Sequence, residues 1–155
     1  MIVFAACRRR GGFVAEAPRI LIIDDDDDFR ASTRALLESR GFAVFEAASG
    51  QEGLARLADC RPDLILLDIM MECCTEGYGV NQAIKWGDEY RDFRHIPVVM
   101  VSSVQEPPDQ LFPMAREVEM IRPDYYVTKP LDVAAFFETI EKALRSSQGG
   151  IARPG

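Results

Sequence analysis

The sequence predicts an α/β fold in which helices cover both faces of a doubly wound sheet of five parallel strands. The first observation is a series of short, continuous apolar runs, which are typical of strands buried on both faces. The second is that segments with apolar residues at helical spacing alternate with these runs, as in a parallel sheet whose strands are joined by helices. The third is the length of 155 residues, which suits one domain and leaves little room for a second. Because the helical connections between parallel strands are right-handed, a doubly wound sheet is the expected arrangement.

The first half of the chain contains three of the expected strands and two of the helices. The acids at 24–28 suit a helix start, because side-chain oxygens cap free N–H groups and the helix dipole favours negative charge. Gly41 is expected to end this helix, and Pro62 to break the chain after the next one. The expected strands are 20–23, 43–46 and 64–67, and the second helix is 51–59. The residues expected on the buried helix faces are Phe29, Thr33, Leu36 and Leu37, then Leu54, Leu57 and Ala58.

The second half is less regular. Prolines at 107, 108 and 113 restrict any helix there to about 114–120 or to a short stretch starting near 109. The expected strands are 97–101 and 125–128. The helices on either side of this region are marked by Val80, Ala83 and Ile84, and by Val133, Phe137, Ile140 and Leu144.

These elements place one domain at 19–146, after a disordered extension at 1–18 and before a flexible tail at 147–155. The formal net charge of −7 argues against nonspecific nucleic-acid binding, which depends on Lys and Arg neutralising phosphates. The apolar runs are far shorter than the roughly 20 residues that a membrane span needs, so we expect no membrane contact. The four cysteines match no metal pattern and are expected to be reduced thiols of a cytoplasmic protein.

Polar residues follow four of the five strands. Asp24 and Asp25 come after the first, Asp68 after the third, Ser102 after the fourth and Lys129 after the fifth. In such sheets sites form at the carboxyl ends of the strands, so these side chains should lie on one rim. Three neighbouring carboxylates repel and need a cation, and hard oxygen ligands select Mg²⁺ or Mn²⁺. A hydroxyl and an ammonium beside them would complete a cradle for a tetrahedral anion.

This cradle suggests phosphoryl chemistry. A carboxylate can attack phosphorus as a nucleophile and form an aspartyl phosphate. The metal would offset negative charge on both partners, and Lys129 would stabilise the equatorial oxygens of the phosphoryl group. Catalysis of this kind is mostly positioning and electrostatics.

The segments 20–26, 62–71, 97–102 and 129–130 resemble the receiver domains of two-component signalling. Each segment alone is a weak signal, but four in order, each at a strand end, are highly specific. The resemblance covers about 19–145. It implies a flavodoxin-like sheet with strand order 2-1-3-4-5.

The resemblance also implies a role for each residue around the metal. Asp68 would be the phosphoacceptor and a metal ligand. Asp25 would bind Mg²⁺ directly, and Asp24 would help through a water. Met70 would offer its backbone carbonyl.

Three further residues would act on the phosphoryl group or respond to it. Ser102 would hydrogen-bond the group and Lys129 would pair with it. Tyr126 matches the aromatic residue that turns inward when receivers are activated. The peptide bond between Lys129 and Pro130 is often cis in the family.

The resemblance implies a stand-alone phosphoacceptor signalling domain rather than an enzyme, for which self-catalysed phosphoryl transfer and slow autodephosphorylation are possible. A histidine kinase or a phosphotransfer protein would phosphorylate Asp68. The phosphoryl group would draw Ser102 toward it and rearrange the surface of the fourth helix, fifth strand and fifth helix. The output would be a protein contact, a relay step or competition for phosphoryl groups. The expected partners are an unidentified downstream protein and a homodimer that forms on phosphorylation.

Two departures from the family pattern leave alternatives open. The loop at 70–77 lacks the usual proline and is one residue longer, which motivates the alternative of a binding-only receiver that no longer turns over phosphate. Retention of all five polar strand-end residues argues against this alternative: Asp24, Asp25, Asp68, Ser102 and Lys129. The proline-rich segment 105–124 is longer than usual, so a typical partner surface is not assumed. A remote alternative is a phosphatase of the haloacid-dehalogenase type, whose nucleophile motif is mimicked by Asp24 and Asp26. That family needs further acids after its lysine, and no suitable strand-end pair follows Lys129.

Overall fold

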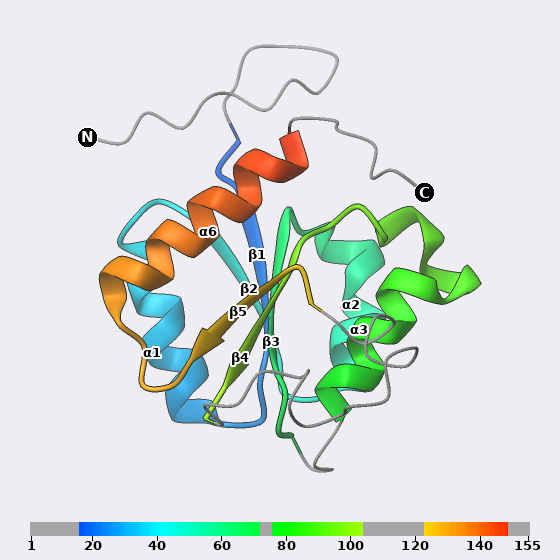
Figure 1. Ribbon diagram of the computed structural model, residues 1–155, viewed down its shortest axis with the longest axis horizontal. Coiled ribbons are helices and arrows are strands. Elements are labelled where there is room, and N and C mark those ends of the chain that lie inside the picture. The colour runs from blue at the N-terminus through cyan, green and yellow to red at the C-terminus, as the bar shows by residue number, and fades with distance from the viewer. Residues whose placement is uncertain (1–15, 72–75, 104–122, 149–155) are drawn as a thin grey trace.

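A computed structural model describes residues 16–71, 76–103 and 123–148 of the chain. Five strands pair side by side in one parallel sheet with the order β2-β1-β3-β4-β5 (Figure 1). The strands are β1 Arg19–Ile23, β2 Ala43–Ala47, β3 Leu64–Asp68, β4 Val98–Ser102 and β5 Tyr125–Thr128. The predicted parallel sheet and its strand order are therefore confirmed.

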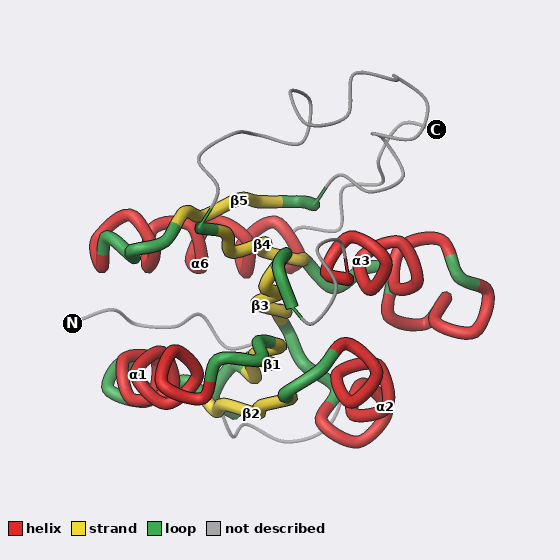
Figure 2. The backbone as a smooth tube through the Cα atoms, turned by 90° about the horizontal axis from the view of Figure 1, so that it is seen from below, coloured by secondary structure: helices red, strands yellow, loops and turns green. Residues whose placement is uncertain are grey.

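Helices cover both faces of the sheet, as predicted. The view along the layers places α1 and α6 on one face and α2 and α3 on the other (Figure 2). Their bounds are α1 Asp27–Glu38, α2 Gly50–Cys60, α3 Glu76–Trp86 and α6 Val133–Gln148. A short 3-10 helix, η1 at Asp88–Phe93, follows α3, and the apolar pattern does not predict it. The helix expected at 114–120 or from about 109 lies outside the described residues.

The two apolar cores explain why the strands are continuously apolar. Successive side chains of a strand point to opposite faces of the sheet. In β1, Leu21 and Ile23 pack against α2 and α3, while Ile20 and Ile22 pack against α1 and α6. All four are at most 1% exposed, and burying each such side chain is worth roughly 1.5–3 kcal/mol.

Caps and turns set the helix ends next to the sheet. The Asp26 carboxylate caps α1 by accepting the N–H groups of Asp28 and Phe29. Past the end of α1, Gly41 has φ +84°, a left-handed conformation that favours glycine, as expected for the residue that stops the helix. The Ser49 hydroxyl caps α2 by accepting the N–H of Glu52.

Two residues expected on buried helix faces are exposed instead. The buried residues of α2 are Gly50, Gly53, Leu57 and Cys60, and Ala58 lies about 100° around the helix from Leu57. Val133 is 48% exposed because it is the first residue of α6, one turn before the helix meets the sheet. The buried residues of α6 are Phe136, Phe137, Ile140, Ala143 and Leu144.

The last helix is longer than the sequence predicts. α6 continues to Gln148, two residues into the expected tail at 147–155. The rest of that tail, and most of the extension expected at 1–18, lie outside the described residues. None of the described helices combines the length and the apolar character that crossing a membrane requires.

A largely buried ion pair ties α3 to the amino-terminal ends of β4 and β5. Lys85 Nζ lies 2.7 Å from Asp124 Oδ2, and these side chains are 12% and 11% exposed. The ammonium also donates to the carbonyl of Ile96 at 2.6 Å, and Asp124 accepts the N–H of Val98 at 2.9 Å. This pair stabilises the end of the sheet opposite to the candidate site.

Candidate functional site

The predicted polar residues meet at the carboxyl-terminal edge of the sheet. Asp24 directly follows β1, while Asp68 and Ser102 are the last residues of β3 and β4. Because the three strands are adjacent and parallel, their ends lie at the same edge. Asp24, Asp68 and Ser102 are 1%, 5% and 0% exposed, whereas Asp25 is exposed. The edge therefore carries a buried polar floor with one carboxylate at its rim.

Three carboxylates form a compact cluster. One oxygen each of Asp24, Asp25 and Asp68 lie within 4.8 Å of one another. Burial raises the pKa of Asp68 to about 6, with help from the charges of Asp24 and Asp25, while Lys129 and the N–H of Met70 oppose the rise. Like charges at this separation favour a bound cation, and carboxylate oxygens are the ligands that Mg²⁺ and Mn²⁺ prefer. The cluster therefore fits a divalent cation.

Lys129 brings a positive charge to this cluster. Its ammonium donates to Asp24 Oδ2 at 2.9 Å and lies 3.7 Å from Asp68 Oδ1. The backbone N–H of Lys129 donates to the carbonyl of Ser102 at 2.6 Å, and the bond to Pro130 is cis. The chain after β5 is thus held against the end of β4, with the ammonium turned toward the carboxylates.

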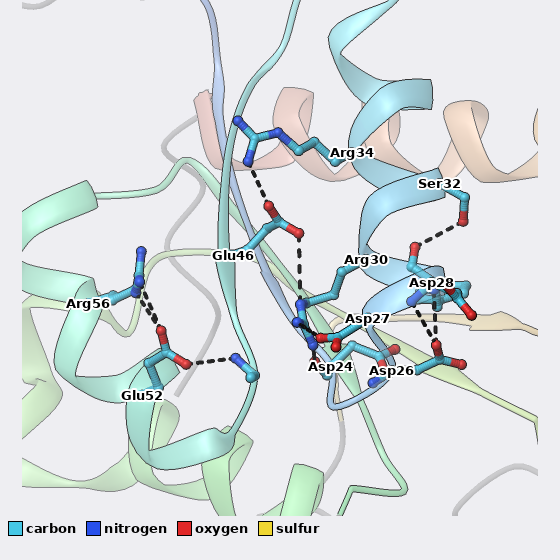
Figure 3. A network of polar contacts seen from close by, with 12 residues as sticks. Asp24, Asp26, Asp27, Asp28, Arg30, Ser32, Arg34, Glu46, Glu52 and Arg56 are labelled. Atoms are coloured by element: carbon cyan, nitrogen blue, oxygen red, sulfur yellow. Dashed lines mark hydrogen bonds and ion pairs between the residues drawn. The ribbon is translucent and has the colours of Figure 1, made fainter.

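A second layer of contacts orients Asp24 and was not predicted. The guanidinium of Arg30, on α1, donates to the Asp24 carbonyl at 2.6 Å, and the N–H of Asp26 donates to Asp24 Oδ1 at 2.9 Å. Arg30 also pairs with Asp27 and lies 3.8 Å from the Glu46 carboxylate (Figure 3). The signal in the sequence is an arginine six residues after Asp24, where α1 turns its side chain back over the end of β1.

The chain beyond Asp68 is held close to it. The N–H of Met70 donates to Asp68 Oδ1 at 3.3 Å, and the N–H of Gly77 donates to the Ile69 carbonyl at 3.3 Å. A Cβ atom at Gly77 would collide with the Asp68 carbonyl oxygen, so α3 approaches the end of β3 as closely as only glycine permits. Residues 72–75 lie outside the described residues. They include Cys73 and Cys74 of the loop at 70–77, which differs from the family pattern.

The expected switch residues lie on β4 and β5. Ser102 is fully buried, whereas the neighbouring Ser103 is exposed. Tyr126 is partly buried and packs against the apolar core under α2 and α3. Its hydroxyl is buried and has no hydrogen-bond partner among the described residues. The roles of Ser102 and Tyr126 remain predictions.

Comparison with known proteins identifies relatives along most of the chain. The family described as "Response regulator receiver domain" matches residues 20–141. DivK of Brucella ovis, a polar-differentiation response regulator, is 32% identical over 128 residues, which is 81% of this chain and 94% of DivK. The transcriptional regulatory protein CseB of Streptomyces avermitilis is 33% identical over 132 residues, which is 85% of this chain. The chain spans about half the length of CseB, because the match covers 51% of that protein.

Solved structures share the fold. A CheY-like receiver domain from Methanospirillum hungatei aligns with a TM-score of 0.69 and 26% identity, covering 85% of this chain and 97% of that domain. The chemotaxis protein CheY4 of Vibrio cholerae aligns with a TM-score of 0.68 and 23% identity, covering 82% and 98%, and supports the fold alone. The family match, the relatives and the arrangement at the sheet edge agree: this chain belongs to the response regulator receiver family of two-component signalling.

Proposed function

We propose that Asp68 accepts a phosphoryl group from a histidine kinase or a phosphotransfer protein, and that its phosphorylation switches a protein-interaction surface. One observation carries the proposal. The carboxylate of Asp68 lies at the end of a central strand, beside two other carboxylates and 3.7 Å from the ammonium of Lys129. This arrangement combines a nucleophile, a site for a divalent cation and a positive charge for the transferred group.

The reaction is a transfer between two nucleophiles. A carboxylate oxygen of Asp68 forms a bond to phosphorus while the bond from phosphorus to the histidine nitrogen of the donor breaks. The electron pair of that bond leaves with the imidazole, and Asp68 becomes an acyl phosphate. Attack by water on the phosphorus would restore the carboxylate and release inorganic phosphate, as a slow autodephosphorylation.

The proposed cation is Mg²⁺ or Mn²⁺. Asp25 and Asp68 would bind it directly, Asp24 through a water, and Met70 through its backbone carbonyl. When bound, the ion offsets negative charge on the acceptor and on the phosphoryl group. Arg30 supports this site by holding the Asp24 carbonyl.

The remaining site residues act on the phosphoryl group. The ammonium of Lys129 pairs with its oxygens, and Ser102 donates its hydroxyl from the end of β4. A shift of Ser102 changes the packing around Tyr126, whose buried hydroxyl has no partner among the described residues. Phosphorylation thereby biases a two-state element and alters the surface near β5 and α6.

The proposed output is binding to a downstream protein in the cytoplasm, with a homodimer of phosphorylated chains as a second form. On this proposal the domain signals through the difference between its phosphorylated and unphosphorylated forms, and it is not a metabolic enzyme. The rest of the expected surface, between β4 and β5, lies outside the described residues.

The test is the intact mass of the protein after incubation with acetyl phosphate and Mg²⁺. The parent should gain the mass of one phosphoryl group, and Asp68→Asn should gain none. Asp59→Asn removes an exposed carboxylate of α2 and should label like the parent. Labelling of Asp68→Asn would place the acceptor elsewhere. No labelling of the parent by either acetyl phosphate or a phosphorylated histidine donor would favour a binding-only receiver.

A further inference from the structure

The Lys129 ammonium has a third neighbour besides the two carboxylates. It lies over the ring of Phe29, 4.0 Å from the ring centre. At this distance the negative face of an aromatic ring attracts a cation, an interaction that extends to about 6 Å. The ammonium therefore lies among three groups: Asp24 at 2.9 Å, Asp68 at 3.7 Å and the Phe29 ring.

The start of α1 holds the backbone of Phe29 in place. Phe29 is in the first turn of this helix, and its N–H donates to Asp26 Oδ1 at 3.1 Å. The side chain is only partly buried, and Phe29 is absent from both apolar cores. Among the described residues, its ring therefore contributes little to the packing under the helices, and the ring contact found there is with the Lys129 ammonium.

The Phe29 ring can limit the motion of the Lys129 side chain. A lysine side chain has four rotatable bonds, so an ammonium held by one partner keeps much of its freedom. Asp24 attracts the ammonium with a full charge and holds it 2.9 Å away, against 3.7 Å for Asp68. The ring carries no net charge and accepts no conventional hydrogen bond. It can therefore limit the motion of the ammonium without competing for the N–H groups that the transferred oxygens need.

We propose that Phe29 is a positioning residue for phosphoryl transfer, which acts by holding the Lys129 ammonium over its ring beside Asp24 and Asp68. The inference rests on the proposed function, because it concerns the rate at which Asp68 is phosphorylated. Loss of the aromatic face should slow phosphorylation by acetyl phosphate about 2- to 30-fold, the range that a cation–π contact supports.

Two variants separate the aromatic face from simple bulk. Phe29→Leu keeps an apolar side chain of similar reach and removes the ring, whereas Phe29→Tyr keeps the ring. A matched control is Phe45→Leu on β2, whose ring lies 5.9 Å from the Arg19 guanidinium at the other end of the sheet. We expect Phe29→Leu to be slow, and Phe29→Tyr and Phe45→Leu to be phosphorylated at rates within about twofold of the parent.

A spectroscopic readout tests the position of the ammonium without any reaction. Protons above an aromatic ring are shifted upfield by its ring current, so the ε-methylene protons of Lys129 should resonate upfield of those of the other lysines. Their signal is assigned by its absence in Lys129→Arg. The upfield shift should persist in Phe29→Tyr and disappear in Phe29→Leu, while the amide spectrum shows that each variant is folded.

Failure of this inference can be told apart from failure of the proposed function. If Phe29→Leu were phosphorylated as fast as the parent, Phe29 would have no positioning role. An unshifted Lys129 signal in the parent would contradict that role as well. If Phe29→Leu were slow while its Lys129 signal stayed upfield, the slow reaction would have another cause and the inference would be wrong. An inert parent would refute the proposed function alone, and the Lys129 signal would still decide whether Phe29 holds the ammonium.

Discussion

Replacing Asp68 with asparagine should stabilise the folded protein when no divalent cation is bound. Asp68 is 5% exposed and its pKa is raised from an ordinary 3.8 to about 6, first by burial and second by the charge of Asp24. At about 1.4 kcal/mol for each unit of pKa, keeping this carboxylate ionised costs up to ~3 kcal/mol of the free energy of unfolding. Asparagine removes the charge and keeps an oxygen that can accept the N–H of Met70, so we expect a gain of about 1–3 kcal/mol at pH 8.

The stability gained by Asp68→Asn should depend on pH. The folded protein binds the Asp68 proton more tightly than the unfolded chain does. The contribution of the protonated Asp68 carboxyl to the free energy of unfolding is therefore fully present below about pH 4, and it is lost as the pH rises through about 6. The advantage of Asp68→Asn should accordingly be large at pH 8 and small at pH 4.

Urea unfolding in EDTA, followed by circular dichroism at both pH values, measures the difference. Asp59→Asn serves as the control for an exposed carboxylate and should change stability by less than ~0.5 kcal/mol at either pH. Added Mg²⁺ should stabilise the parent more than Asp68→Asn, since we expect the parent to bind the ion more tightly. If Asp68→Asn were less stable than the parent at pH 8 in EDTA, the ionised Asp68 carboxylate would not destabilise the fold, and the prediction would be wrong.

Three other substitutions test the surroundings of the site. Gly77→Ala places a Cβ against the Asp68 carbonyl oxygen, so we expect a loss of about 2–4 kcal/mol in urea unfolding together with slower phosphorylation. Lys85→Met removes the ammonium from the largely buried Asp124 carboxylate, and should cost about 2–4 kcal/mol while the phosphorylation rate per folded molecule stays that of the parent. Arg30→Gln removes the guanidinium from the Asp24 carbonyl and should weaken Mg²⁺ binding about tenfold or more in calorimetry, and an unchanged affinity would show that Arg30 does not support the site.

The strands could be predicted because burial on both faces leaves a direct trace in the sequence. The run at 64–67 is apolar throughout since one set of its side chains meets α2 and α3 and the other meets α1 and α6. The helix faces were predicted less well. Spacing alone does not say where a helix meets the sheet, and Val133 precedes that point. The 3-10 helix at Asp88–Phe93 has no apolar period to detect and no side-chain cap at its start.

The buried polar residues of the site could be predicted because the ends of adjacent parallel strands meet at one edge. Asp24, Asp68 and Ser102 each stand at such an end, so their position follows from the strand boundaries. Arg30 and Phe29 could not be found in this way, because their contacts depend on how α1 turns over the sheet. Phe29 has the spacing of a core residue and instead places its ring beside the Lys129 ammonium.

The central claim is that Asp68 takes up a phosphoryl group. Borohydride reduces an acyl phosphate to an alcohol, so it converts a phosphorylated aspartate to homoserine, which peptide mass spectrometry locates in the chain. After treatment with acetyl phosphate and Mg²⁺ and then with borohydride, we expect homoserine at position 68 of the parent and at no other aspartate. Homoserine at position 24 or 25, or none in a sample that carries the added phosphoryl mass, would contradict the account.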